Sequence, residues 1–108
     1  MPSAPLKPLV FEILLSLSAE PQHGWSLARV VQERLGGERI LPGNFYRTLR
    51  RLLADGVIED APSKHREEDE RRRYFRLTAR GERMARDEAR RLNALVADAR
   101  MQKLLRAR

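Results

Sequence analysis

Apolar positions recur at helical spacing along the first third of the chain. They predict a first helix over residues 6–19, a turn at residues 20–24 that contains Pro21 and Gly24, and a second helix over residues 25–35. Gly36 and Gly37 are expected to end the second helix. The apolar positions that define the two helices are Leu6, Leu9, Val10, Ile13, Leu14, Leu17, Leu27, Val30, Val31 and Leu35.

The next segment predicts a third helix with one apolar and one polar side. Residues 39–41 are expected to be extended, because a proline at position 42 disfavours helix at the residue before it. The third helix then covers residues 43–55, and Gly56 supplies its exit. Its predicted buried residues are Phe45, Leu49, Leu52 and Leu53.

Two short strand candidates follow, at residues 57–60 and 72–77, and a polar loop joins them. Thr78 is the expected N-cap of a long helix that runs from residue 79 to the chain end. This order of elements predicts a mainly helical fold with a small β wing, the winged helix-turn-helix. We expect that domain over residues 1–77, with its wing at 57–77, and a C-terminal dimerisation helix over residues 78–108. In such a fold the third helix enters the DNA major groove and the wing lies over the adjacent backbone.

The composition narrows the class of protein. A chain of 108 residues is long enough for one domain, and the absence of cysteine excludes disulfide scaffolds, thiolate metal sites and cysteine nucleophiles. The apolar stretch at residues 8–19 is interrupted by Glu12 and lacks a secretion cleavage site, so we expect no membrane segment and a cytoplasmic location. Two isolated histidines supply no nucleophile–base pair, so we expect neither an enzyme nor a metal or cofactor site.

Positive charge is concentrated in two segments. The chain has 22 lysines and arginines against 15 acids, a net charge of +7, and 19 of the 22 bases are arginine. Residues 42–54 hold three arginines and no acid, and residues 71–83 hold six arginines and one acid, so the two segments carry +3 and +5. This location favours an anion-binding face, although two ordinary solvated surfaces remain an alternative.

Four short motifs of the chain match known sequence patterns. Residues 23–28 read HGWSLA, similar to H-G-Y-x-L, and residues 42–52 read PGNFYRTLRRL, similar to P-G-T-L-Y-x-x-L-x-R-L. Residues 55–58 (DGVI) and 71–81 (RRRYFRLTARG) are similar to x-G-x-I and R-R-x-Y-Y-x-L-T-x-x-G. Together the four motifs resemble those of the phenolic acid decarboxylase regulator (PadR) family. The sequence departs from the family pattern at Trp25, Asn44 and Phe45, where Tyr, Thr or Ser, and Leu are usual, so we expect a different operator preference.

The resemblance implies a transcriptional regulator of the short subclass with one C-terminal helix. Arg47 and Arg50 share a helix face, and we expect one to bind a guanine edge and the other a phosphate, with solvated arginines as the alternative. Asn44 could cap the helix or reach a base edge. For Tyr46 the resemblance implies a phosphate contact, with core packing as the alternative, and Arg51 is expected nearer the body of the domain, where a DNA contact is left open.

The wing supplies the remaining predicted contacts. Lys64, His65 and Arg66 lie at the hairpin tip and Arg72 on its return, where bases could follow phosphates or enter the minor groove. The acidic run at residues 67–70 either points away and pairs with the following arginines or weakens the wing's engagement. The predicted DNA-binding residues are Asn44, Tyr46, Arg47, Arg50, Arg51, Lys64, His65 and Arg72.

A stripe of small and apolar residues along the last helix is typical of a coiled-coil seam, with packing inside a monomer as the alternative. The resemblance implies a homodimer made by this helix with the partner's first helix, which would place two half-sites roughly 34 Å apart on DNA. It also implies a small, flat, apolar or aromatic effector near that interface, for which the candidate lining is Glu12 and Ser16, with Leu92 opposite. The predicted seam residues are Ala85, Ala89, Leu92, Val96 and Ala99.

Three further residues have structural interpretations. His23 is expected to make a hydrogen bond at the start of the second helix, and Trp25 and Phe75 are expected to pack in the core. The preferred hypothesis is a homodimeric repressor that binds double-stranded operator DNA and releases it when an effector changes the angle between its halves. The alternatives are a winged-helix adaptor for protein interactions, whose binding would depend little on salt, and a non-specific DNA-binding protein.

Overall fold

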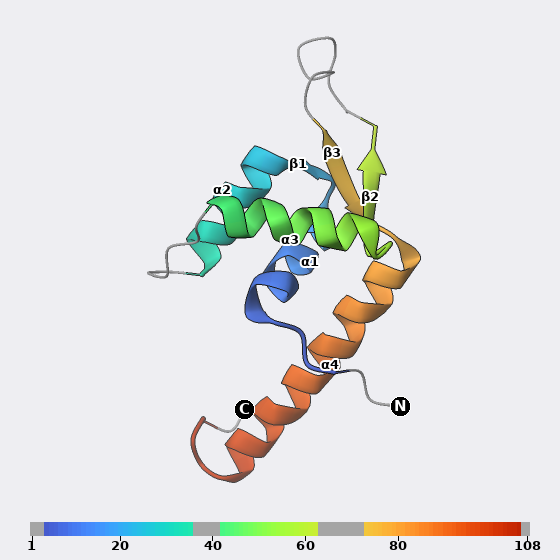
Figure 1. Ribbon diagram of the computed structural model, residues 1–108. Coiled ribbons are helices and arrows are strands. Elements are labelled where there is room, and N and C mark those ends of the chain that lie inside the picture. The colour runs from blue at the N-terminus through green and yellow to red at the C-terminus, as the bar shows by residue number, and fades with distance from the viewer. Residues whose placement is uncertain (1–3, 36–41, 63–72, 107–108) are drawn as a thin grey trace.

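The computed structural model describes residues 4–35, 42–62 and 73–106. Within these ranges, four helices and a three-stranded antiparallel sheet follow the order of a winged helix-turn-helix, as predicted (Figure 1). The elements are α1 (Pro8–Ala19), β1 (Gln22–His23), α2 (Gly24–Arg34), α3 (Pro42–Ala54), β2 (Ile58–Ala61), β3 (Tyr74–Leu77) and α4 (Ala79–Met101).

The core forms where α1, α2 and α3 meet the base of the sheet. Each helix contributes the residues that repeat at helical spacing, so the apolar pattern of the sequence identifies most of the buried side chains. Phe75 of β3 joins them at 6% exposure, as predicted. The buried apolar residues are Ile13, Leu14, Leu17, Leu27, Val31, Phe45, Leu49, Leu52, Val57, Ile58 and Phe75.

Two helices differ in length from the prediction. α1 begins at Pro8 and not at Leu6, because the residue before a proline is driven out of helical geometry, and Lys7 is extended at φ −64° and ψ 145°. α4 ends at Met101 instead of running to the chain end. There Lys103 takes a left-handed conformation at φ 64°, and the Leu104 N–H donates to the Ala99 carbonyl at 2.9 Å. These contacts are those of a Schellman cap.

The sheet contains a strand where we expected only a turn. β3 lies in the middle of the sheet, between β2 and the two-residue strand β1. Gln22 pairs with Phe75 and His23 with Tyr74. A two-residue strand is too short to show an alternating pattern, so only its pairing with β3 reveals it.

The base of the wing is locked to the start of α4. The Thr78 hydroxyl accepts the Gly81 N–H at 3.1 Å, which confirms the predicted N-cap, and it lies 2.6 Å from the Gly56 carbonyl, to which it donates. Gly81 lies so close to Val57, the residue before β2, that a Cβ on Gly81 would come within 2.2 Å of the Val57 carbonyl oxygen. The wing therefore has a fixed direction relative to α4 at this joint.

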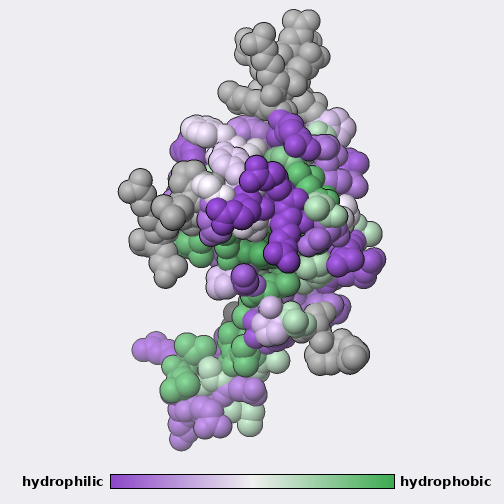
Figure 2. Space-filling model, in the orientation of Figure 1, coloured by the Kyte–Doolittle hydropathy of each residue, from purple (hydrophilic) through white to green (hydrophobic). Residues whose placement is uncertain are grey.

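The second half of α4 extends away from the rest of the domain (Figure 1), and the Cα atoms span 53 × 33 × 25 Å. Apolar residues gather at this far end, as the green patches at the bottom of Figure 2 show. Leu95, Met101 and Leu104 are 52%, 80% and 77% exposed. In the part of the chain that the structure describes, no helix is both long and apolar enough to cross a membrane.

Candidate nucleic-acid interface

α3 presents one side to the core and the other to solvent. Phe45, Leu49 and Leu52 are only 2–5% exposed, and a helical turn of about 3.6 residues directs the positions between them outward. Figure 2 shows hydrophilic residues gathered over α3 at the centre of this face. The predicted contacts on the outward side are all exposed: Asn44, Tyr46, Arg47, Arg50 and Arg51.

The order of these residues around the helix follows from the same geometry. Arg47 occupies the middle of the outward side, and Arg50 and Arg51 flank it on opposite sides. Tyr46 lies at the edge beyond Arg50, and Asn44 lies toward the other edge, beyond Arg51. Arg51 is exposed as well, so a DNA contact by this residue stays a prediction. Asn44 falls within the first turn, since α3 begins at Pro42, two residues earlier.

The arginines of α3 have no acidic partner among the described residues. Asp55 lies one helical turn beyond Arg51, but the ion pairs of the described chain involve none of Arg47, Arg50 and Arg51. Three full positive charges are thus presented to solvent from a single helix.

The arginines at the base of the wing are paired with carboxylates instead. Glu59 lies directly opposite Arg76 in the β2–β3 register, and the Arg76 Nε donates to its carboxylate at 2.8 Å. Asp60 lies opposite Phe75, and both of its carboxylate oxygens accept from the Arg73 guanidinium, at 2.9 and 3.0 Å. Two arginines and two acids leave this part of the wing without net charge.

Trp25 is not a core residue, contrary to our expectation. Its side chain is 61% exposed, although it lies in the first turn of α2, only two positions before the buried Leu27. The indole stacks on the His23 ring at 6.2 Å, and the Arg29 guanidinium lies 5.0 Å from its centroid. His23 itself has the predicted role, since its Nδ1 accepts the Ser26 N–H at 3.2 Å and caps α2.

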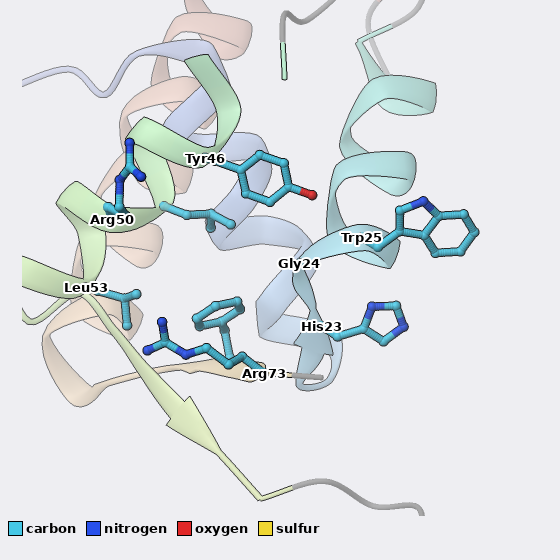
Figure 3. A pocket seen from close by; sticks show the side chains of 9 residues that line it. His23, Gly24, Trp25, Tyr46, Arg50, Leu53 and Arg73 are labelled. Carbon is cyan, nitrogen blue, oxygen red and sulfur yellow. The ribbon is translucent and has the colours of Figure 1, made fainter. Parts of the chain in front are cut away.

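A cavity of about 720 Å³ lies between α3, β3 and the start of α2 (Figure 3). The cavity is lined by Tyr46 and Arg50 of α3, by Trp25 of α2, and by Arg73, the residue before β3. The sequence carried no pattern for this cavity, because its walls come from segments far apart along the chain. Its lining residues are His23, Gly24, Trp25, Tyr46, Leu49, Arg50, Leu53, Arg73 and Phe75.

The predicted contacts at the wing tip, Lys64, His65 and Arg72, lie outside the described residues, as does the acidic run at residues 67–70. Within the described ranges, no three side chains of the types that bind metals lie close enough together to hold an ion.

The predicted seam of α4 is only partly exposed. Ala85 packs against the core of its own domain, and Ala89 is exposed. Leu92, Val96 and Ala99 are half-buried.

α4 also carries a buried acid that the sequence did not point to. Glu88 is 5% exposed and accepts two hydrogen bonds from Arg91, each at 2.7 Å. These bonds, together with one from the Leu6 backbone N–H, hold the pKa of Glu88 below its usual value.

The three residues predicted to line an effector site lie on α1 and α4. Glu12 forms an ion pair with Arg34 and so joins α1 to α2. Ser16 is 7% exposed, and its hydroxyl has no hydrogen-bond partner among the described residues. Leu92 lies on α4 as predicted, half-buried.

A helix that presents unpaired cations beside a β wing is the arrangement of a DNA-binding winged helix-turn-helix protein. The particular family follows from sequence comparison: the profile of the transcriptional regulator PadR-like family matches residues 13–87, so the chain belongs to this family. The protein is therefore a DNA-binding transcriptional regulator and not an enzyme. A comparison with curated protein sequences finds no significant match.

Solved structures of such regulators have the same fold. A PadR family regulator from Clostridium difficile R20291 is 20% identical, with a TM-score of 0.72 over 88% of this chain and 97% of its own. A PadR-like regulator from Bacillus cereus is 21% identical, with a TM-score of 0.73 and 93% of each chain covered. RosR from H. salinarum is 24% identical, with a TM-score of 0.62 over 90% of this chain and 96% of its own.

Proposed function

We propose that the protein is a repressor that binds a specific operator in double-stranded DNA as a homodimer and releases it on binding a small apolar or aromatic effector. The observation that carries the proposal is the outward side of α3, where Arg47, Arg50 and Arg51 have no acidic partner in the described chain. Unpaired guanidiniums are free to bind guanine edges bidentately and to contact phosphates.

Each residue has a role in this proposal. Of Arg47 and Arg50, one would bind a guanine edge in the major groove and the other a phosphate. Tyr46, at one edge of the outward side, would contact a phosphate, and Arg51 is a further candidate DNA contact. Asn44 lies in the first turn, the part of a recognition helix that reaches furthest into the groove. Lys64, His65 and Arg72 remain proposed wing contacts.

The homodimer is supported by the apolar far end of α4. Leu95 is 52% exposed and Leu104 77% exposed, on a segment that extends past its own domain. A second copy of the helix would cover these side chains and would bring two α3 helices onto one face of DNA. We keep Ala85, Ala89, Leu92, Val96 and Ala99 as the proposed seam, and Glu12, Ser16 and Leu92 as a proposed effector lining.

The test is a gel-shift titration against the DNA immediately upstream of the protein's own gene, with random duplex as competitor, at two salt concentrations. We expect tight, salt-sensitive binding that resists the competitor. Binding no tighter than to random duplex would reject sequence-specific recognition of this site. Binding that is absent, or that salt does not change, would favour an adaptor for protein interactions.

The dimer is tested separately by light scattering on Leu92→Glu, which would place a charge in the proposed seam. We expect the mass in solution to fall from that of a dimer to that of a monomer. Asn93→Glu, at the neighbouring exposed position, is the matched control and should leave the dimer intact. An unchanged mass for Leu92→Glu would place the interface elsewhere.

A further inference from the structure

The outward side of α3 borders a groove that separates it from α2. The groove has a volume of about 400 Å³, and Tyr46 lines it from α3 while Trp25 and Arg29 line it from α2. Figure 3 shows the Tyr46 side chain directed from α3 toward α2, with its hydroxyl foremost. Tyr46, a predicted DNA contact, therefore connects the outward side of α3 with the surface that Trp25 and Arg29 form on α2, the Trp25–Arg29 surface.

The Trp25–Arg29 surface holds an aromatic ring and a positive charge side by side. Trp25 is 61% exposed, and its ring stacks with that of His23 at a centroid distance of 6.2 Å. The Arg29 guanidinium lies 5.0 Å from the centroid of the indole, and no ion pair of the described chain involves Arg29. The stacking and the cation–π contact hold both groups at the surface, where they are available to a ligand that has an apolar part and a negative charge.

A sugar-phosphate strand has both of these features. When a helix lies in the major groove of DNA, which is about 12 Å wide, one strand borders the helix on each side. With α3 in the groove, the strand on the side of Tyr46 runs past the first turns of α2, because the Tyr46 side chain extends from one helix toward the other. A deoxyribose offers C–H groups to an aromatic ring, and the phosphates beside it bind a guanidinium. An extended strand meets these side chains one after another, so they need not converge on a single point.

We propose that Trp25 packs against a deoxyribose and that Arg29 binds a neighbouring phosphate in the DNA strand that borders α3 on the side of Tyr46. The inference rests on the proposed function, in which α3 lies in the major groove, and it extends the DNA contact to α2, where the sequence predicted none. Glu33 also lines the groove and repels phosphate, but it follows Trp25 by eight residues, about 12 Å along the helix, and so limits the contact to the first turns of α2. Contacts to sugar and phosphate carry no sequence information, so the Trp25–Arg29 surface adds affinity for every duplex and leaves the choice of operator to α3.

The direct test uses Trp25, the only tryptophan of the chain, as its own reporter. Acrylamide, a neutral quencher, should quench its fluorescence strongly in the free protein, and the quenching constant should fall by at least about half when random duplex saturates the protein, because the strand covers the exposed ring. The anisotropy of a labelled duplex measures saturation in the same samples. Quenching that stays the same at saturation would overturn the inference and leave DNA binding by α3 intact, whereas a duplex that does not bind would overturn both. A quenching constant that falls with protein concentration alone, without DNA, would assign the surface to a second copy of the chain instead.

Variants separate the apolar contact from the charged one. Trp25→Ala should weaken the binding of operator and random duplex alike, by about 3–10-fold, without changing the slope of log Kd against log salt concentration. Arg29→Ala should lower that slope by about 0.9, the value of one phosphate contact. Trp25→Phe, which keeps a ring, and Glu33→Gln, at another exposed position of the groove, are the matched controls and should not weaken binding by more than about twofold. Thermal melts establish that every variant is folded. Parent values of both affinity and slope in Trp25→Ala and Arg29→Ala would overturn the inference.

Discussion

The recognition helix α3 and the base of the wing are both rich in arginine, but their charges are arranged in opposite ways. In α3, Arg47 and Arg50 project from a helix side that carries no acid. In the wing, Arg73 and Arg76 face Asp60 and Glu59 across the β2–β3 ladder. A count of charges along the sequence treats the two regions alike, whereas strand pairing cancels the charge of one and leaves that of the other.

This difference implies that α3 and the base of the wing contribute differently to DNA binding. The carboxylates of the wing base not only occupy the arginines but also repel phosphate, so this part of the wing contributes little attraction to DNA. α3 is the region from which both base recognition and phosphate attraction would come. The wing pairs are exposed, however, and exposed pairs contribute only about 0–1 kcal/mol to folding, so the charges could be altered without unfolding the domain.

The largest expected effect comes from removing the unpaired charges. Arg47→Ala with Arg50→Ala should weaken operator binding by about 2–6 kcal/mol, because a bidentate contact to a base contributes about 1–3 kcal/mol and a charged hydrogen bond to a phosphate about 1.5–3 kcal/mol. The matched control, Arg73→Ala with Arg76→Ala, should weaken it by less than about 1 kcal/mol. Fluorescence anisotropy with operator and random duplex measures both. Equal losses of affinity in the two double variants would contradict the claim that the arginines of α3 contribute more to DNA binding than those of the wing.

A second prediction concerns the joint that fixes the wing. Gly81→Ala should gain about 1 kcal/mol of helix propensity, but its Cβ would overlap the Val57 carbonyl oxygen, and such overpacking costs about 1–3 kcal/mol or more. Because the overlap at 2.2 Å is with backbone, which cannot rotate away, we expect a net loss and a lower Tm. Gly43→Ala, where a Cβ meets only the Arg47 guanidinium at 3.9 Å, is the control and should not lower the Tm. A Tm for Gly81→Ala at or above that of the parent would show that the backbone at Val57 shifts to make room for the added Cβ.

The third prediction concerns a tighter binding to DNA, obtained by removing the acids that pair with the wing arginines. Glu59→Gln with Asp60→Asn keeps the shape of the wing and frees Arg73 and Arg76 for phosphate. We expect binding to random duplex to tighten about 3–10-fold at low salt, and the gain to disappear at high salt. An affinity that stays the same at low salt would show that the paired state of these arginines is irrelevant to DNA.

The smallest expected effect is on thermal stability, and it distinguishes the buried ion pair of Glu88 from the exposed ion pair of Glu59. Glu88 is 5% exposed and held by Arg91, so Glu88→Gln should lower the Tm at pH 7 by roughly 4–8 °C at fixed protein concentration, whereas Glu59→Gln should change it little. Because the pKa of Glu88 is lowered below 4.5, its contribution is complete above pH 4.5 and is lost as the pH falls through the lowered pKa. Thermal melts of both variants at pH 7 and at pH 3 measure this. A Tm difference that persists unchanged at pH 3 would contradict an electrostatic origin.

The sequence predicted the parts of the fold that depend on local pattern. The third helix, its buried residues Phe45, Leu49 and Leu52, and the Thr78 cap follow from spacing and capping chemistry within a few residues. These signals suffice because a helix buries the same face along its whole length. The order of elements then points to the winged helix-turn-helix.

The features that the sequence could not predict arise between segments. Trp25 is apolar, and nothing near it in the sequence indicates that its side chain is exposed while Leu27 in the same turn of α2 is buried. Strand β1 exists only because β3 pairs with it, and the Asp60–Arg73 contact requires the register of β2 against β3. The cavity beside α3 is of the same kind, since its walls meet only after folding.

The salt dependence of operator binding tests the division between α3 and the wing most directly. The slope of log Kd against log salt concentration counts the phosphates neutralised, at about 0.9 per contact in duplex DNA. We predict that the slope falls by about 1 when Arg47 and Arg50 are replaced by alanine, because one of the two contacts a phosphate, and stays within error of the parent when Arg73 and Arg76 are replaced. A slope that falls for the wing variant and holds for the α3 variant would contradict the account.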